Sequence, residues 1–450
     1  MLIPELYPLF KKSSGISTDT RSISPGNIFF ALKGENFNGN LFAQKALDAG
    51  AAYVVVDETH FPANEKIIAV NDVLKTLQQL AMHHRKQLPA KIIAISGSNG
   101  KTTTKELISR VLETTYNTFS TRGNLNNHIG VPLSLLSIKE ETEFAVIEMG
   151  ANHSGETKLL SEIAAPDFGL ITNNGKDHLE GYGNIEGVRK GNGELYDFLR
   201  ERKPGQAIAF VCIDQDDLIK MSEGIQRVTY GENESADYNG KIEKLFPFLE
   251  IEYTKQDRSR FTKPARSERK QLLTEQKPLI KTQLIGKYNF ENLMAAICIG
   301  SYFSVPDEKI KQAIESYSPS NNRSQIVKRR TNTFILDAYN ANPSSVNAAL
   351  ENFFALPSEN KIVILGDMAE LGIASHREHR EVIERLRKEE LKMGVLVGEE
   401  FGKALGDHDA SFVHFKNVEQ LKEWFASQSF ENYFFLLKAS RVIGLEKLLS

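Results

Sequence analysis

Short apolar runs alternate with longer amphipathic segments along most of the chain. A run such as 144–148 is typical of a short buried strand, whereas 73–87 has apolar residues at helical spacing and is followed by Pro89. This alternation predicts an α/β fold with parallel, doubly wound sheets. The helices are expected over 42–49, 73–87 (capped by Asn71), 102–112, 345–356 and 376–392. The strands are expected over 28–32, 52–56, 67–70, 91–95, 144–148, 168–172, 333–336, 361–365, 395–397 and 433–437.

Length and composition extend this prediction to several domains. A chain of 450 residues corresponds to about three domains of ordinary size. Hydrophobic residues make up 41% and charged residues 25%, which excludes a disordered chain, a collagen-like fibre and a coiled coil. The net charge of −3 gives no reason to expect a nucleic acid or an acidic membrane as partner. From the grouping of the elements, we expect domains over 1–86, 87–315 and 316–450.

Cysteine usage and hydropathy indicate a cytoplasmic protein. The two cysteines, Cys212 and Cys298, form no CxxC pair, so a disulfide framework or a thiolate metal site is not expected. No apolar run approaches the roughly 18 residues of a membrane-spanning helix. Near the N-terminus, Lys11 and Lys12 follow the apolar stretch, whereas in a secretory signal the positive charges precede it. The basic segment 254–278 is interpreted as a solvated loop, with a nucleic-acid patch as the alternative.

A glycine-rich turn follows the strand expected over 91–95. It has the sequence Gly-Ser-Asn-Gly-Lys-Thr-Thr-Thr over 97–104 and leads into a helix. Backbone N–H groups of such a turn converge on phosphate oxygens, and the helix N-terminus adds partial positive charge. We expect Lys101 to contact the β- and γ-phosphates of a nucleotide and Thr102 to bind Mg²⁺. The turn is a shorter variant of the usual motif, because position 95 is isoleucine, and a purely structural turn is the alternative.

Two further polar residues lie at or just after the ends of predicted strands. Glu148 ends the strand over 144–148, and His178 follows the strand over 168–172 by a few residues. Because the carboxyl ends of parallel strands form one binding edge, both are candidates for the site that binds the nucleotide and its metal. A surface strand terminus is the alternative for Glu148, and an ordinary loop residue is the alternative for His178.

Asparagine-rich segments form a third group of candidates. The loop over 122–130 concentrates amide groups, for which turn formation is the alternative. Asn289 and Asn292 are three residues apart at a predicted helix start, so they share a face that suits a purine edge, with capping as the alternative. Asp337 ends a strand just before Asn-Ala-Asn-Pro, where it could meet a ribose or a metal.

Together these segments resemble the Mur ligases, the ATP-dependent amide-forming enzymes of peptidoglycan synthesis. The resemblance covers essentially the whole chain, and it depends on the order and spacing of the motifs. The segments over 340–343 and 366–372 are similar to the branch that adds D-alanyl-D-alanine, and the Asp-Asn-Pro-Arg segment of the branch that adds a diamino acid is not found. The other matching segments are 17–21, 97–104, 123–133, 148–153 and 178–181.

The resemblance implies a three-domain architecture with a central P-loop sheet and a Rossmann-like C-terminal domain. It implies that ATP phosphorylates the peptide carboxylate of UDP-N-acetylmuramoyl-tripeptide. The amino group of D-alanyl-D-alanine then attacks the acyl phosphate to give an amide, ADP and phosphate. The implied cofactors are ATP and Mg²⁺. The implied partners are these small molecules, and no nucleic acid is implied as a partner. The resemblance also implies a monomeric protein without a membrane-spanning segment.

Residue roles follow from the resemblance position by position. Catalysis is implied for Lys101, Glu148 and His178, with one Mg²⁺ held by Thr102 and Glu148 and a second by His178. Asn289 and Asn292 would meet the adenine. Nucleotide binding is implied for Gly97, Ser98, Asn99, Gly100, Lys101, Thr102, Thr103, Asn289, Asn292, Arg323 and Asp337. Substrate binding is implied for Thr20 and Arg21 near the UDP part and for Asn124, Asn126, Asn127, Tyr339 and Asn342.

One departure concerns the second metal. The family usually carries a carbamylated lysine followed by Gly-Glu, whereas this chain has Asn192 before Gly193-Glu194. Asparagine offers only a neutral carbonyl oxygen, so a ligase-derived binding protein with reduced turnover stays an alternative, beside a ligase of another Mur branch. Smaller departures are Asn38-Gly39-Asn40, where Asp-Gly-His is frequent, and Tyr288, where histidine is frequent. We expect hinges near residues 86 and 315 that let the domains close on the nucleotide.

Overall fold

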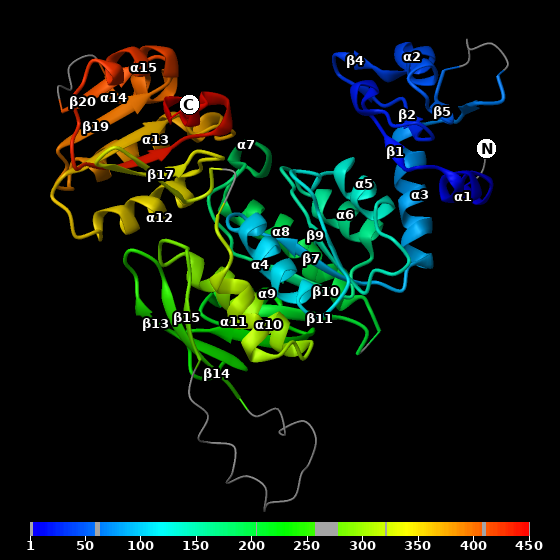
Figure 1. Cartoon of the computed structure of the whole chain (residues 1–450), viewed down its shortest axis with the longest axis horizontal. Coiled ribbons are helices and arrows are strands. Elements are labelled where there is room, and N and C mark those ends of the chain that lie inside the picture. The colour runs from blue at the N-terminus through cyan, green and yellow to red at the C-terminus, as the bar shows by residue number, and fades with distance from the viewer. Residues whose placement is uncertain are drawn as a thin grey trace, which may run out of the picture.

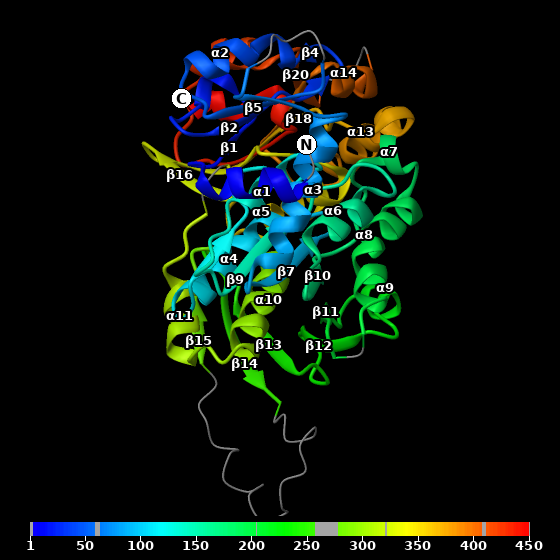
Figure 2. The ribbon, with the colours of Figure 1, turned by 90° about the vertical axis from the view of Figure 1, so that its right-hand side faces the viewer.

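The residues that the computed structural model describes form three main sheets, of four, nine and six strands, arranged in chain order (Figure 1). The N-terminal and C-terminal sheets lie at opposite upper corners of this view, with the nine-stranded sheet below them. Turned by 90°, both outer sheets lie above the central one (Figure 2). No helix among the described residues is long and apolar enough to cross a membrane. The structure describes residues 3–58, 64–203, 205–256, 278–319, 322–406 and 411–449.

The N-terminal unit is a parallel sheet in the order β1-β2-β5-β6. Ile28 and Phe30 face the main core beneath α3, whereas Phe29 packs on the opposite face with α2, so the strand is apolar throughout. Asp72 caps α3 by accepting a hydrogen bond from the Lys75 N–H, so the prediction of Asn71 as cap is wrong. Its elements are α1 (Ile3–Lys12), β1 (Ile16–Ser17), β2 (Ile28–Phe30), β3 (Lys33–Gly34), β4 (Phe37–Asn38), α2 (Ala43–Asp48), β5 (Tyr53–Val56), β6 (Ile67–Ala69) and α3 (Val73–Gln87).

The central unit has the strand order β15-β14-β13-β12-β11-β10-β7-β9-β8. The part from β8 to β13 is parallel, and β14 and β15 extend it as antiparallel strands. Of these strands, the hydrophobic pattern predicted β7, β9 and β10, and it did not predict β8 or β11 to β15. Its strands are β7 (Lys91–Ser96), β8 (Thr118–Ser120), β9 (Phe144–Glu148), β10 (Phe168–Ile171), β11 (Ile208–Cys212), β12 (Gln226–Gly231), β13 (Tyr238–Lys244), β14 (Glu250–Lys255) and β15 (Leu279–Lys281). Its helices are α4 (Lys101–Glu113), α5 (Gly130–Leu136), α6 (Glu156–Ala164), α7 (Leu179–Tyr182), α8 (Ile185–Arg200), α9 (Asp216–Met221), α10 (Asn289–Tyr302) and α11 (Asp307–Glu315).

The C-terminal unit has the strand order β16-β17-β21-β18-β19-β20, parallel except for the edge strand β16. Separate apolar clusters cover the two faces of this sheet, as expected for a doubly wound fold. Its strands are β16 (Gln325–Arg329), β17 (Asn332–Asp337), β18 (Lys361–Gly366), β19 (Met393–Val397), β20 (Phe412–Phe415) and β21 (Phe434–Lys438). Its helices are α12 (Pro343–Phe354), α13 (Ser375–Leu386), α14 (Glu399–Leu405) and α15 (Val418–Ala426).

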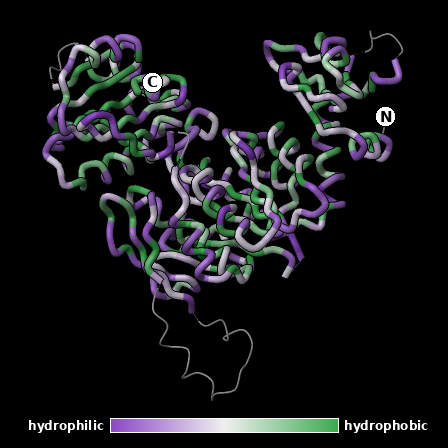
Figure 3. Tube along the Cα trace, in the orientation of Figure 1, coloured by the Kyte–Doolittle hydropathy of each residue, from purple (hydrophilic) through white to green (hydrophobic). Residues whose placement is uncertain are grey.

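The largest core runs from the N-terminal unit into the central one through α3. Leu77 and Leu80 of this helix are fully buried in one cluster with Ile92 and Ile93 of β7. Figure 3 shows apolar stretches of the chain running through the sheets of all three units. The α/β prediction is confirmed, and every predicted strand and helix is present: 73–87 and 144–148 have the predicted ends, and the ends of the others are shifted. The helix expected over 376–392 ends earlier, at Leu386, and most of the basic segment 254–278 lies outside the described residues.

Candidate active site

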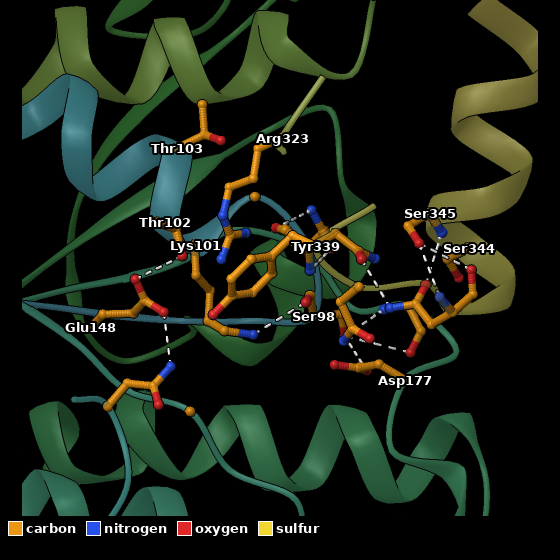
Figure 4. Close-up of a pocket in the computed structure, with 18 of the residues that line it drawn as sticks. Ser98, Lys101, Thr102, Thr103, Glu148, Asp177, Arg323, Tyr339, Ser344 and Ser345 are labelled. Carbon is orange, nitrogen blue, oxygen red and sulfur yellow. Dashed lines mark hydrogen bonds between the residues drawn. The ribbon is translucent and has the colours of Figure 1, made fainter. Parts of the chain in front are cut away.

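A cavity of about 630 Å³ lies where the strand ends of the central unit meet the C-terminal unit. We call it the central cavity. Figure 4 shows α4 on one side, with Lys101 and Thr102, and α12 on the other, with Ser344 and Ser345. Of the predicted site residues, those that line the cavity are Ser98, Asn99, Gly100, Lys101, Thr102, Thr103, Asn124, Asn126, Asn127, Glu148, His178, Asn289, Asn292, Arg323, Asp337, Tyr339 and Asn342.

The glycine-rich turn requires its glycines. Gly97 has φ +121°, and a Cβ at this position would clash with the Thr172 hydroxyl oxygen. Gly100 has φ +84° and is the N-cap of α4, where a Cβ would lie 2.6 Å from Oδ1 of Asn292. No side chain caps α4, so its first backbone N–H groups are available to an anion. Gly97 does not line the cavity, but its carbonyl accepts a hydrogen bond from Lys101 Nζ, which also donates to Ser98 O.

The turn is fastened to the loop that follows β10. The Ser98 hydroxyl donates to Oδ1 of Asp177 and accepts from the Gly175 N–H. The Asn99 N–H donates to Oδ1 of Asn173, whose side-chain amide donates back to Asn99 O. Asp177 is 5% exposed and lines the cavity. The sequence reasoning missed it, although it directly precedes His178.

Glu148 is a second buried carboxylate of the cavity, with 3% of its surface exposed. The Thr102 hydroxyl donates to its Oε2 over 3.0 Å, and the Asn126 amide donates to Oε1 over 2.8 Å. Lys105 Nζ lies 3.7 Å from Oε2 and is itself buried. The sequence reasoning missed Lys105, although its place one helical turn after Lys101 puts it on the same face of α4. The structure therefore gathers a hydroxyl, a carboxylate and an ammonium at the end of β9.

His178 turns toward the C-terminal unit. Its backbone has φ +45°, and its Nδ1 lies 2.6 Å from Oε2 of Glu370. Contact with His178 lowers the pKa of Glu370. The Glu180 N–H donates to Glu370 O, so the loop after β18 packs directly on α7. Among the described residues, no group of three or more His, Cys, Asp or Glu side chains is arranged to hold a metal ion.

Asn289 and Asn292 lie together at the start of α10. The Asn292 amide donates to Oδ1 of Asn289, and the Thr104 hydroxyl donates to Oδ1 of Asn292. Neither side chain caps the helix, whose N-cap is Tyr288 without a side-chain cap bond, so capping does not explain them. Burial raises the pKa of Tyr288, which forms a 2.6 Å hydrogen bond with Ser324 across the junction of the two units.

The C-terminal unit brings further polar groups to the cavity. The Arg323 guanidinium lies 3.6 Å from the centre of the Tyr339 ring, and Figure 4 shows this pair close to Lys101 and Thr102. Asp337 accepts a hydrogen bond from Lys438 Nζ over 2.7 Å. Asn342 caps α12 and donates through its side-chain amide to Oδ1 of Asn99 over 2.9 Å. The two units therefore touch at the glycine-rich turn itself.

Some predicted site residues have local partners or lie elsewhere. Oδ1 of Asn127 accepts from the N–H groups of Ile129 and Gly130, which is the turn role that was the alternative for this loop. Thr20 and Arg21 lie in the N-terminal unit and do not line the cavity. Arg21 binds the carboxylate of Asp19, and these hydrogen bonds lower the pKa of Asp19 to about 2.

Comparison with known proteins gives the family. Three family models match the chain: the Mur ligase family catalytic domain over 12–85, the Mur ligase middle domain over 95–300, and the Mur ligase glutamate ligase domain over 322–441. The UDP-N-acetylmuramoyl-tripeptide–D-alanyl-D-alanine ligase of Bacillus subtilis strain 168 is 32% identical over 96% of this chain and 92% of its own length. The chain belongs to the Mur ligase family.

Solved structures agree with this assignment. MurF from Acinetobacter baumannii superposes with a TM-score of 0.85 at 27% identity, covering 99% of this Mur ligase and 97% of the other chain. MurF from Thermotoga maritima, solved in complex with ADP, superposes with a TM-score of 0.82 at 24% identity, covering 98% and 97%. The architecture predicted from the family resemblance is thereby confirmed.

The position that departs from the Mur ligase pattern is buried near the cavity. Asn192 of α8 is 5% exposed and does not line the cavity. Its side-chain amide donates to Oδ1 of Asn174 over 2.9 Å, and its Oδ1 accepts from the Ser96 hydroxyl over 3.3 Å. The other substituted positions, Asn38 and Asn40, hydrogen-bond to each other and to the carboxylates of Glu58 and Asp57. Asn192 thus ties two strand ends together.

Proposed function

We propose that this Mur ligase joins D-alanyl-D-alanine to the peptide carboxylate of UDP-N-acetylmuramoyl-tripeptide, with conversion of ATP to ADP and phosphate. The observation that supports it is the central cavity, where a phosphate-binding turn and a buried carboxylate face the strand ends of a second unit. The 32% identity to the Bacillus subtilis ligase over nearly the whole chain selects this reaction among the Mur branches. We place the reaction in the cytoplasm, where ATP and UDP-sugars are found.

The glycine-rich turn would bind the triphosphate of ATP. The N–H groups at the start of α4 point partial positive charge at the phosphates, and Lys101 can move from the carbonyls of Gly97 and Ser98 to the β- and γ-phosphates. The fastening of the turn by Asn173 and Asp177 fixes its shape before the nucleotide arrives. The turn thereby positions the γ-phosphoryl group for transfer to the peptide carboxylate.

Thr102 and Glu148 fit a Mg²⁺ site, because a hydroxyl and a buried carboxylate 3.0 Å apart offer the oxygen ligands that this ion prefers. Mg²⁺ bound there would offset the repulsion between triphosphate and carboxylate and polarise the phosphoryl oxygens. His178 lines the same cavity and would hold a second ion only after exchanging its contact with Glu370. Asn126 orients the Glu148 carboxylate through its other oxygen.

The remaining roles are assigned by location. Asn289 and Asn292 would bind the adenine, and Arg323 and Asp337 would close on the nucleotide from the C-terminal unit. Asn124 and Asn126 would contact the peptide part of the substrate, which enters beside Glu148. In the N-terminal unit, Thr20 and Arg21 would hold the UDP part. In the C-terminal unit, Tyr339 and Asn342 would meet the dipeptide.

We propose domain boundaries at 86/87 and 315/316, with closure around the nucleotide. The contacts that support closure cross the second boundary: Asn342 to Asn99, and Lys176 Nζ to the buried carboxylate of Glu378 over 2.9 Å. Small-angle scattering with and without an ATP analogue and the UDP-tripeptide tests this proposal. We expect a smaller radius of gyration with ligands, and an unchanged radius would contradict closure.

The reaction itself is tested by ATP hydrolysis. We expect phosphate release to require both the UDP-tripeptide and D-alanyl-D-alanine, and release with a single free amino acid in place of the dipeptide would refute the assignment. Asn192 favours a second candidate, a ligase-derived nucleotide-binding protein with reduced turnover. Assaying Asn192→Lys with and without bicarbonate distinguishes the two. If the substitution and bicarbonate together strongly increase turnover, the natural chain is a protein with reduced turnover. If the natural chain is already fully active, this second candidate is excluded.

A further inference from the structure

Two arginines flank the ring of Tyr339. The guanidinium carbon of Arg323 lies 3.6 Å from the ring centre, and that of Arg441 lies 5.7 Å from it. Tyr339 follows β17 and Arg441 follows β21, and these strands are adjacent and parallel. Their carboxyl ends therefore present both residues at one edge of the C-terminal sheet, the edge at which such sheets bind ligands. Tyr339 and Arg323 line the central cavity, and Arg441 approaches this lining over the tyrosine ring.

The cations of this region differ in whether they already have partners. Lys438 is committed to Asp337 and to the carbonyl of Asn340. Within the part of the chain that the structure describes, neither Arg323 nor Arg441 has a hydrogen bond or an ion pair with an acidic residue. A guanidinium carries five N–H donors in a planar fork that matches a carboxylate or a phosphate. The guanidinium groups of Arg323 and Arg441, both beside the ring of Tyr339, can therefore bind anions that come from a ligand.

The proposed reaction brings three anions to this cavity: the triphosphate, the peptide carboxylate of UDP-N-acetylmuramoyl-tripeptide and the C-terminal carboxylate of the dipeptide. The triphosphate belongs at the glycine-rich turn, and Figure 4 shows Arg323 on the side of Lys101 and Thr102. The peptide carboxylate must lie beside the γ-phosphate that is transferred to it, so the C-terminal carboxylate of the dipeptide is the anion that remains for the second arginine. We propose that Arg441, beside the ring of Tyr339, binds the C-terminal carboxylate of the incoming dipeptide. This inference rests on the proposed function and adds a recognition residue to it.

The length of the dipeptide gives the proposal a geometric requirement. An extended dipeptide spans about 7 Å from its amino group to its carboxylate. The proposal places the amine at the reacting carbon and the carboxylate at Arg441, so it requires these two positions to be about this far apart. A single amino acid is half as long, so its carboxylate would not reach Arg441 while its amine is in place. Val442, next to Arg441, is 82% exposed and offers an apolar surface to a methyl side chain.

The experiment compares two acceptors and two proteins. D-alanyl-D-alanine and its C-terminal amide differ only in the carboxylate, and Arg441→Met removes the guanidinium while keeping an unbranched side chain. We expect the natural protein to have a KM roughly 10- to 100-fold lower for the acid than for the amide, as for a charge-assisted hydrogen-bonded pair. Arg441→Met should raise the KM of the acid by this factor, leave the KM of the amide unchanged, and leave the KM of ATP and of the UDP-tripeptide unchanged.

Controls separate this inference from the proposed function. Arg380→Met removes an exposed arginine of α13 and should keep the full preference for the acid. Arg441→Lys keeps the charge but lacks the planar guanidinium, so its preference for the acid over the amide should be intermediate. This variant also keeps the test valid if the methionine variant is unstable. A natural preference for the acid that persists in both Arg441 variants overturns the inference while the proposed function stands. If the natural protein does not hydrolyse ATP with the dipeptide at all, both are overturned.

Discussion

Replacing Glu291 by glutamine tests whether a carboxyl group of the central unit is held protonated near neutral pH. Glu291 lies on α10 between the two asparagines proposed for adenine binding. Its Oε2 accepts a hydrogen bond of 2.6 Å from Gln215, which also donates to Thr172 O at the end of β10. Burial raises the pKa of Glu291 to about 7, against 4.5 for an exposed glutamate, although the hydrogen bond from Gln215 opposes the shift.

The size and sign of the effect follow from these two pKa values. Between pH 4.5 and about 7, the folded protein retains a proton on Glu291 that the unfolded chain has lost. The free energy of unfolding therefore falls as the pH rises through this window, and the loss is complete above the folded pKa. At 1.36 kcal/mol per pKa unit, the difference between 4.5 and about 7 corresponds to about 3 kcal/mol.

The assay compares the natural protein with Glu291→Gln between about pH 5 and pH 8. Glutamine cannot ionise and can still accept from Gln215, so we expect the variant to gain about 3 kcal/mol relative to the natural protein across this range. Urea unfolding followed by circular dichroism measures the change. The single tryptophan, Trp424, lies in the C-terminal unit, so its fluorescence shows whether that unit unfolds together with the central unit. If the free energy of unfolding measured by circular dichroism has the same pH dependence in both proteins, the reasoning is refuted.

Three further predictions concern the cavity. Gly97→Ala should destabilise the protein by more than about 1 kcal/mol and weaken ATP binding, as measured by thermal unfolding and calorimetry, because a Cβ there clashes with Thr172 at positive φ. Lys176→Met should lower the melting temperature by a few degrees, and Glu378→Gln in the same chain should restore it, because the buried carboxylate loses its partner across the units and keeps only Arg377. Glu148→Gln, or chelation of Mg²⁺, should lower kcat at least about 100-fold without unfolding the protein.

The sequence predicted the strand ends of the site well because two independent signals coincide there. A buried strand must be apolar on both faces, and the first polar residue at its carboxyl end marks the sheet edge. Glu148 is such a residue, and it lies within hydrogen-bond distance of Thr102, which follows the adjacent strand β7. The antiparallel strands β14 and β15 escaped prediction because alternating polar residues such as those of Glu250–Lys255 are shared by edge strands and loops.

Contacts between distant segments escaped the sequence for a different reason. No spacing rule connects His178 with Glu370, or Asn99 with Asn342, because each pair joins two separately folded sheets. The pairing depends on how the units are oriented, and this is a property of tertiary packing. Lys105 is an intermediate case, since its helical spacing from Lys101 was visible while its burial against Glu148 was not.

Asn192 shows why a substituted motif position is best interpreted through its partners. Its amide donates to Asn174 and its carbonyl oxygen accepts from Ser96, so both halves of the side chain are already used in joining the ends of β7 and β10. A lysine at this buried position would lose these hydrogen bonds and would need an anion or a modification to neutralise its charge. The carboxylate of Glu148 already has a buried cation, Lys105. The charge balance of this cavity is therefore built without a charged residue at position 192, and the consequence of Asn192 for turnover depends on how Lys105 and Glu148 share the phosphates and the metal.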